Sequence, residues 1–214
     1  MSHAVISSVT VDDARKSPPT RKAVRRVVDA ALADRPDRLI VEPGDSAYPD
    51  VLLAEVVATL MIAERLDVEI AYAPTSATAA TTRYGLPHGP AALDLARHGD
   101  ARELPLIRDD AATVLVGTAR HLGADAKLHG ESYVDDSRLF AGSVRGIRIE
   151  PMREAPGLRA RVERRLRSGR WHIGRAAQTG GTNLVVEREG VVTERIVKRS
   201  TFYRHHVDWK LVCP

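Results

Sequence analysis

The 214-residue sequence contains a single cysteine, Cys213, next to its last residue. One cysteine excludes an internal disulfide and any zinc site built from several cysteines. No apolar run reaches the roughly 18 residues that a membrane-spanning helix needs. The first residues, which include His3 and Asp12, also lack the basic-then-apolar pattern of a secretory signal. We therefore expect a cytoplasmic protein.

Aromatic residues are also scarce, at 4% of the chain. Proteins that hold single-stranded nucleic acid stack its bases on aromatic side chains, so we do not expect nucleic acid as a partner. The formal net charge of +4 gives only a weak overall field, and local clusters of charge therefore matter more. The chain is long enough for one large domain or two lobes with a substantial core.

The first half of the chain alternates between strand and helix patterns. Thr20 is placed to cap a helix over 21–33, where valines recur at helical spacing. A short strand is expected over 4–11. Further along, apolar runs predict buried strands at 39–41 and 68–73, and periodic runs predict helices over 50–66, 75–82 and 90–97. This alternation is typical of a parallel, Rossmann-like sheet with right-handed crossovers.

After residue 102 the pattern changes to strands. Glu189-Gly190 stands between two strand patterns and predicts a hairpin. Leu158, Val162 and Leu166 are spaced four residues apart and predict a helix over 158–167. The expected strands are 103–108, 112–117, 145–150, 183–188, 191–198 and 209–212. We therefore divide the chain into a first lobe, residues 1–102, and a β-rich, mainly antiparallel lobe, residues 103–214.

Three stretches carry a resemblance to a known family. A strand runs into Pro43-Gly44-Asp45-Ser46-Ala47, the next strand runs into Pro74 and on to Tyr84-Gly85-Leu86-Pro87, and a later strand runs into Glu189-Gly190. In order and spacing they resemble the GGDGT loop, the PLGTGND loop with its LG-aliphatic-Pro ending, and the Asp-Gly-Glu segment of the diacylglycerol kinase and lipid kinase family, whose proteins resemble the NAD kinases in fold.

The resemblance implies an α/β fold with a Rossmann-like parallel-sheet N-terminal lobe followed by a β-rich antiparallel C-terminal lobe. It also implies an ancestral reaction in which the γ-phosphoryl group of ATP passes to a lipid hydroxyl with the help of Mg²⁺. The family's opening strand has no evident counterpart here. A second protomer could supply that strand or pair with the open sheet edge, which makes a homodimer a further expectation.

The candidate nucleotide site lies in the two loops after the predicted strands at 39–41 and 68–73. Most glycines of the family's loops are replaced here by Pro, Ser, Ala and Thr, and Pro43 also lacks a backbone N–H. We therefore expect a degenerate member of the family, with ATP and Mg²⁺ as ligands only if the site still works. Alternatively, the loops are plain turns that cap the next helices. The candidate residues are Gly44, Asp45, Ser46, Thr75 and Ser76.

A candidate metal site is the adjacent pair Asp135 and Asp136, near Glu131. Mg²⁺ takes oxygen ligands and keeps several of its waters. On a strand the two carboxylates would point to opposite faces, so they would need a turn to converge. The alternative is a solvated turn.

A basic stretch over 159–175 is the candidate for contact with an anionic surface. If 158–167 is helical, most of its arginines lie off the apolar stripe. Such a face suits an anionic membrane surface to which the protein would be peripheral, a partner, or equally the phosphates of nucleic acid. The alternative is a solvated outer face. The residues assigned to this contact are Arg161, Arg164, Arg165, Arg167 and Arg170.

Three functional hypotheses follow. The first is a degenerate lipid-kinase-like protein that still binds a nucleotide or another anionic ligand between its lobes. The second is a non-enzymatic binding or regulatory protein that uses the basic stretch on membranes or a partner. The third is an active ATP-dependent lipid kinase with altered loops.

Overall fold

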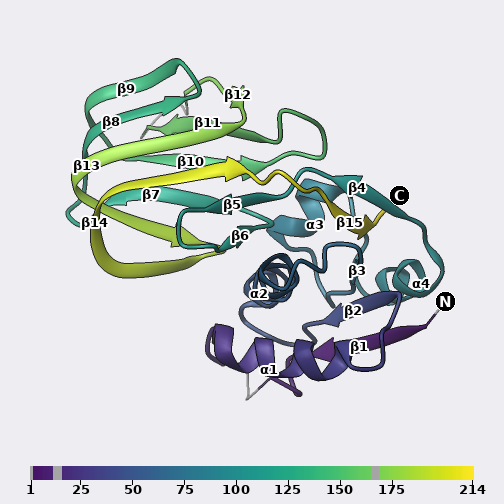
Figure 1. The fold of residues 1–214 in the computed structure, drawn as a ribbon. Helices are drawn as coiled ribbons and strands as arrows, with labels where there is room; N and C mark the ends of the chain where they lie inside the picture. The colour runs from purple at the N-terminus through teal and green to yellow at the C-terminus, as the bar shows by residue number, and fades with distance from the viewer. Residues whose placement is uncertain (1, 12–15, 165–168) are drawn as a thin grey trace.

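Two β-sheets organise the chain, one mainly parallel and one antiparallel (Figure 1). The computed structural model describes residues 2–11, 16–164 and 169–214. Figure 1 shows the mainly parallel sheet and its helices at lower right and the antiparallel sheet at upper left, with α3 (Ala79–Tyr84) between them. This arrangement confirms the predicted fold class. No helix in the described ranges is both long enough and apolar enough to cross a membrane.

The first sheet is covered by helices on both faces. Over the described residues it has five strands in the order β1 (His3–Ser7), β2 (Arg38–Glu42), β3 (Glu69–Tyr72), β15 (Trp209–Val212) and β4 (Ala101–Leu104). The first four run parallel and β4 runs antiparallel to β15. The helices besides α3 are α1 (Arg21–Leu32), α2 (Pro49–Ile62) and α4 (Pro90–His98).

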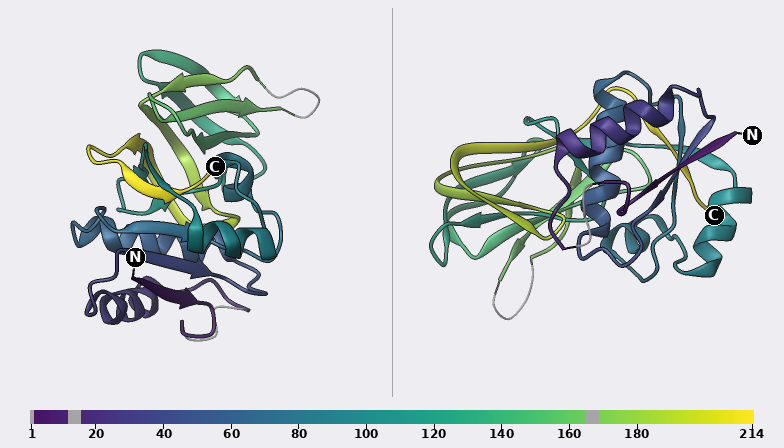
Figure 2. Two further views of the ribbon diagram at one scale, coloured as in Figure 1. Left: turned by 90° about the vertical axis from the view of Figure 1, so that its right-hand side faces the viewer. Right: turned by 90° about the horizontal axis from the view of Figure 1, so that it is seen from below.

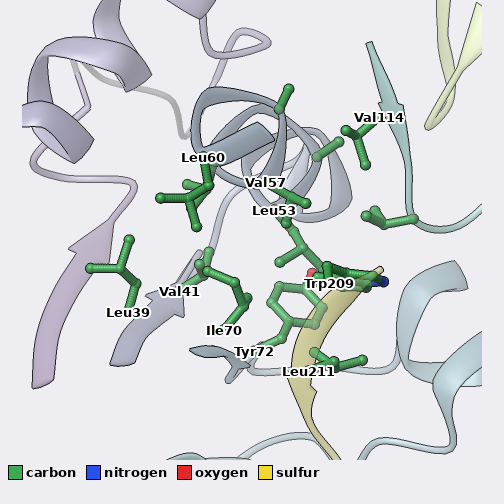
Figure 3. Close-up of a cluster of buried hydrophobic side chains, with 14 of the residues drawn as sticks. Leu39, Val41, Leu53, Val57, Leu60, Ile70, Tyr72, Val114, Trp209 and Leu211 are labelled. Carbon is green, nitrogen blue, oxygen red and sulfur yellow. The ribbon is translucent and has the colours of Figure 1, made fainter. Parts of the chain in front are cut away.

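Alternation along the strands fills two cores. Leu39 and Val41 face the core that contains α1 and α2, whereas Ile40 between them faces α4. Successive side chains of a strand point to opposite faces, so a fully apolar strand is buried on both sides. Figure 3 shows the larger cluster, in which Tyr72 and Trp209 lie next to each other beneath α2. The helix predicted over 21–33 is confirmed as α1, and Thr20 accepts a hydrogen bond from its first turn.

The chain supplies its own opening strand. β1 pairs with β2 in parallel over its whole length, from His3 opposite Arg38 to Ser7 opposite Glu42. The strand expected over 4–11 is thus confirmed as a shorter strand over 3–7. The family's opening strand therefore has a counterpart in this chain, and the edge of β2 that a second protomer was expected to cover is occupied by β1.

The second sheet is antiparallel. Over the described residues it comprises ten strands: β5 (Ile107–Asp109), β6 (Val114–Leu115), β7 (Ala119–Gly123), β8 (Leu128–Val134), β9 (Ser137–Val144), β10 (Gly146–Pro151), β11 (Leu158–Glu163), β12 (His172–Gly174), β13 (Ala176–Arg188) and β14 (Val191–Arg204). The predicted hairpin is confirmed, because Arg188 pairs with Val191 across Glu189 and Gly190. Both turn residues have positive φ, 48° and 81°, as a tight two-residue hairpin turn requires.

The helix predicted over 158–167 is contradicted by the structure over 158–163. These residues form β11, which pairs with β10 on one side and β12 on the other. Leu158, Ala160 and Val162 are buried and the residues between them are not. Residues four apart lie on the same face of a strand as well as on the same face of a helix. Here the pairing with β10 and β12 determines that the segment is a strand. Residues 165–168 of the predicted helix lie outside the described residues.

The C-terminal strand returns to the first lobe. β15 lies between β3 and β4 in the first sheet, and Leu211 pairs with Ile70 of β3 and with Arg102 of β4. Figures 1 and 2 show the yellow C-terminal segment leaving the antiparallel sheet and ending among the elements of the first lobe. The division at residue 102 places this strand in the second lobe by sequence, while its hydrogen bonds lie in the first sheet.

Candidate functional site

The two predicted loops meet at the carboxyl end of β2 and β3, and we call residues 43–46 and 74–77 the loop crest. The Thr75 hydroxyl donates a 3.0 Å hydrogen bond to the carbonyl oxygen of Gly44. Asp45, Thr75 and Ser76 are exposed there, while Gly44 and Ser46 are half-buried. The carboxyl ends of strands are the usual place for ligands in open α/β sheets. The structure thus brings all five sequence-predicted nucleotide residues together.

Local chemistry explains the shape of these loops. Gly44 has a φ of +57°, which favours glycine, and the N–H of Ser46 donates to the carbonyl of Pro43. In the second loop, Thr78 and Thr81 form a reciprocal capping box, so α3 begins at Ala79. The helix predicted over 75–82 therefore starts later than expected, and Thr78 rather than Ser76 is its cap.

A buried carboxylate lies behind the loop crest. Asp50, in the first turn of α2, is 7% exposed. Its Oδ1 accepts a 2.9 Å hydrogen bond from the Tyr72 hydroxyl and its Oδ2 a 3.1 Å bond from the N–H of Ala80 at the start of α3. A helix start offers free N–H groups and the positive end of the helix dipole. Here a side chain of the protein occupies part of that anion-binding position.

A second carboxylate reaches the same region from the other lobe. Glu189 in the β13–β14 turn accepts hydrogen bonds from three consecutive backbone N–H groups, those of Val116 and Gly117 on Oε1 and that of Thr118 on Oε2, at 2.8, 3.0 and 3.1 Å. Consecutive N–H groups that converge in this way form an anion-binding concavity. This position is also filled by a carboxylate of the chain.

The two carboxylates lie close together. A Cβ added to Gly117 would stand 2.6 Å from Glu189 Oε2 and 3.2 Å from Asp50 Oδ2. Burial, followed by the nearby charge of Asp50, raises the pKa of Glu189 to about 8, against the three N–H donors that lower it. Burial and then Asp50 also raise the pKa of Tyr72 far above its ordinary value. The lobe interface thus holds two acidic side chains close together, and burial next to Asp50 makes Glu189 harder to ionise than an exposed glutamate.

The predicted metal pair is a turn. Asp135 and Asp136 join β8 to β9, and the Asp135 carboxylate accepts hydrogen bonds from the backbone N–H groups of Arg175 and Ala176 at 2.9–3.1 Å. Among the described residues, no group of three His, Cys, Asp or Glu side chains is placed to hold a metal ion. The oxygens of Asp50 and Glu189 are committed to N–H and O–H donors, so the residues here do not fit a protein-built Mg²⁺ site.

The basic stretch divides between two environments. Arg161 lies within β11 and is half-buried, whereas Arg164 and Arg170 are exposed beyond its end. Arg164 lines a cavity of about 760 Å³ together with Lys127 and Phe140. Arg165 and Arg167 lie outside the described residues. Because β11 is a strand, Arg161 does not lie on the cationic helix face that we expected.

Comparisons with known proteins agree with this architecture. No protein-family model matches the chain, and no curated protein does. Among solved structures, a diacylglycerol kinase-like protein from Bacillus anthracis str. Sterne superimposes with a TM-score of 0.65 at 10% identity, over 91% of this chain and 83% of the other. The fold is that of the diacylglycerol kinases and NAD kinases.

Two NAD(H) kinases extend the comparison. An NAD kinase from Archaeoglobus fulgidus, solved in complex with ATP, has a TM-score of 0.60 at 12% identity and covers 99% of this chain and 93% of its own. The yeast NADH kinase, solved with NADH, has a TM-score of 0.53 at 8% identity, over 83% of this chain and 62% of its own. Identities this low establish the fold alone.

Sequence reasoning found the loop crest but missed Asp50 and its partner Tyr72. A signal was present, because Asp50 is an acidic residue in the first turn of a mostly apolar helix. Glu189 was identified from the sequence only as a hairpin-turn residue and as the counterpart of the family's Asp. Its backbone donors at 116–118 could not be identified, since they depend on tertiary contact.

Proposed function

We propose that the protein is a kinase-fold binding protein that holds a nucleotide or a similar anionic ligand at the loop crest and does not transfer a phosphoryl group. The observation that carries the proposal is the occupation of the anion-binding N–H groups between the lobes by Asp50 and Glu189. Phosphoryl transfer depends on positioning and on stabilising negative charge. N–H donors that already bind carboxylates of the chain cannot position a phosphate or stabilise its negative charge.

The loop crest supports the binding half of the proposal. Its two loops are tied by the Thr75–Gly44 hydrogen bond, and Asp45, Thr75 and Ser76 present polar groups at the strand ends. A carboxylate in such a position can accept hydrogen bonds from ribose hydroxyls. The Thr75 hydroxyl already donates to Gly44 and holds the two loops together, so the Ser76 hydroxyl is the one that can donate to a phosphate in place of the backbone donors that the missing glycines would have allowed.

The conformation of Glu189 adds to the argument. A non-glycine residue with a φ of 48° is uncommon and mildly strained. The strain is compensated by the three N–H contacts of its carboxylate. The positive φ is that of the tight hairpin turn, and the turn places the Glu189 carboxylate between the lobes.

Calorimetric titration with ATP and Mg²⁺ tests the binding half. We expect saturable heat for the wild type, weaker binding for Asp45→Ala and for Thr75→Val, and unchanged binding for Asp125→Ala, which removes an exposed acid on the far sheet. Absence of both heat and thermal stabilisation at millimolar ATP would overturn binding.

A transfer assay tests the other half. Purified protein is incubated with γ-labelled ATP, Mg²⁺ and either diacylglycerol vesicles or NAD. We expect no label in either acceptor. Label that appears with the wild type, and is lost in Asp45→Ala, would establish an active kinase instead.

A further inference from the structure

Three arginines stand side by side on the outer face of the second sheet, and we call Arg120, Arg148 and Arg161 the arginine row. Arg148 of β10 is directly opposite Arg161 of β11 on one side and directly opposite Arg120 of β7 on the other. Its strand neighbours Ile147 and Ile149 are fully buried in the core, so the row faces away from it. Like charges placed directly opposite one another destabilise a sheet.

Only one of the three has its charge fully compensated. Arg120 donates to Glu163 at 2.7 Å and to Glu187 at 3.3 Å. Arg148 comes no nearer than 3.7 Å to Glu150 and 4.0 Å to Glu163, which is too far for a hydrogen bond.

Arg161 packs against an aromatic ring instead. Its guanidinium carbon lies 4.3 Å from the ring centre of Trp171. Within the part of the chain that the structure describes, Nε of Arg148 and Nε of Arg161 are buried and have no hydrogen-bond partner. Buried donors without partners are costly. The Nε atoms are out of reach of solvent, and that of Arg148 faces Glu150 and Glu163 at ion-pair distance, so a bound group would meet the outer N–H groups of the two guanidiniums.

The surroundings add positive charge. Glu150, 4% exposed, already accepts hydrogen bonds from Arg159 and from Arg83 of α3 on the same oxygen. Burial lowers the pKa of the Arg83 guanidinium, and Arg159 and Arg148 lower it further, against the opposing effect of Glu150. The charged groups of this face carry an excess of two positive charges. They are the five guanidinium groups of Arg83, Arg120, Arg148, Arg159 and Arg161 and the three carboxylates of Glu150, Glu163 and Glu187.

We propose that the arginine row binds a phosphate monoester, with Arg148 and Arg161 as the principal donors. A phosphate monoester carries about two negative charges at neutral pH, which matches the excess charge of the set. Guanidinium groups suit its oxygens because they donate through a planar fork. The site lies on the second sheet, is separate from the loop crest and does not depend on the proposed function.

Trp171 provides a built-in reporter for this site. The chain has two tryptophans, and the other one, Trp209, is 1% exposed in the core of the first lobe. A group that binds Arg161 changes the surroundings of the Trp171 ring. We therefore expect inorganic phosphate and glycerol 3-phosphate to change tryptophan fluorescence saturably, at constant ionic strength maintained with chloride.

A charge-matched pair of variants tests the donors. Arg148→Gln plus Arg161→Gln is expected to weaken phosphate binding at least about tenfold. Arg102→Gln plus Arg138→Gln removes the same charge from exposed positions on β4 and β9 and should leave binding unchanged. Asp45→Ala should also leave it unchanged, so that failure at the loop crest and failure here are told apart.

Vesicle binding distinguishes a soluble phosphate monoester from the phosphate headgroup of a lipid. Binding of soluble phosphates through the row identifies a soluble ligand. Binding restricted to phosphatidate vesicles, absent with phosphatidylcholine vesicles and lost in the double variant, identifies a lipid headgroup. If neither binds, or if both bind equally well to the double variant, the proposal is overturned.

Thermal unfolding supplies a second measurement that does not need the double variant to fold. Phosphate should raise the unfolding temperature of the wild type more than chloride does at equal ionic strength. Arg148→Gln alone should raise it without phosphate, because it removes the repulsion within the row, and should lose the phosphate effect. A wild type that responds equally to both salts would contradict the proposal.

Discussion

The Tyr72 hydroxyl at the end of β3 donates a 2.9 Å hydrogen bond to Asp50 in the first turn of α2. Both side chains are buried, at 2% and 7% exposure. Asp50 also accepts from Ala80 of α3, so one carboxylate joins a strand and two helix starts. This contact fixes the position of the loop crest relative to the interior of the first lobe.

Removing the Tyr72 hydroxyl should therefore weaken the first lobe. Tyr72→Phe leaves a buried carboxylate with one donor fewer, and we expect the free energy of unfolding to fall by about 1–3 kcal/mol. Urea denaturation measures the change. Tyr133→Phe is the matched control, because the Tyr133 hydroxyl donates to Glu131 on the exposed surface. Equal losses from both variants would show that burial of the Asp50 contact has no special weight.

The raised pKa of Glu189 predicts a pH dependence of stability. Its ordinary pKa is 4.5 and its pKa in the folded protein is about 8. Between these values the folded state holds the proton more tightly than the unfolded state, so stability falls as pH rises. From about pH 5 to about pH 8.5, we expect the free energy of unfolding to decrease by about 4 kcal/mol from this group.

Glu189→Gln cannot ionise and should flatten that pH dependence. Glu194→Gln, at an exposed position of β14, should keep the wild-type slope. Urea midpoints across the pH range give the comparison. A wild type whose stability is constant or increases over the range would show that the three N–H donors outweigh burial and Asp50.

Gly117 predicts a packing limit at the lobe interface. A methyl group there would stand 2.6 Å from Glu189 Oε2 and 2.9 Å from the Cβ of Ala79. We expect Gly117→Ala to destabilise the protein by about 1–3 kcal/mol through overpacking. Gly180→Ala is the control, since the nearest atom to its added Cβ is the carbonyl oxygen of Lys198 at 3.9 Å. Thermal unfolding of both variants measures the difference. Equal unfolding temperatures would show that the interface can shift to accommodate the added methyl group.

Local patterns in the sequence were sufficient for much of the fold. The Thr20 cap, the apolar strand around Ile40 and the Glu189-Gly190 turn each involve residues within one element and its ends, and each is confirmed. The helix prediction over 158–163 was wrong because Leu158 and Val162, four residues apart, fit the spacing of both a helix and a strand. The strand pairing of Arg161 with Arg148 settles the ambiguity, and no local pattern contains that information.

The candidate site was predictable only in its exposed part. Asp45 and Thr75 follow strand ends, and their convergence follows from parallel pairing of the strands. The Glu189 contacts with backbone at 116–118 and the alignment of Arg120, Arg148 and Arg161 depend on how distant strands are placed in register. A single sequence does not specify those distances.

The place of β15 in the middle of the first sheet has a consequence for synthesis of the protein. β3 leaves the ribosome early, yet its neighbour on one side is made only after all ten strands of the second sheet as described. Until Leu211 reaches Ile70, that strand edge has no permanent partner, and an open edge invites pairing with other chains. The first lobe therefore becomes complete only when the rest of the chain has been translated.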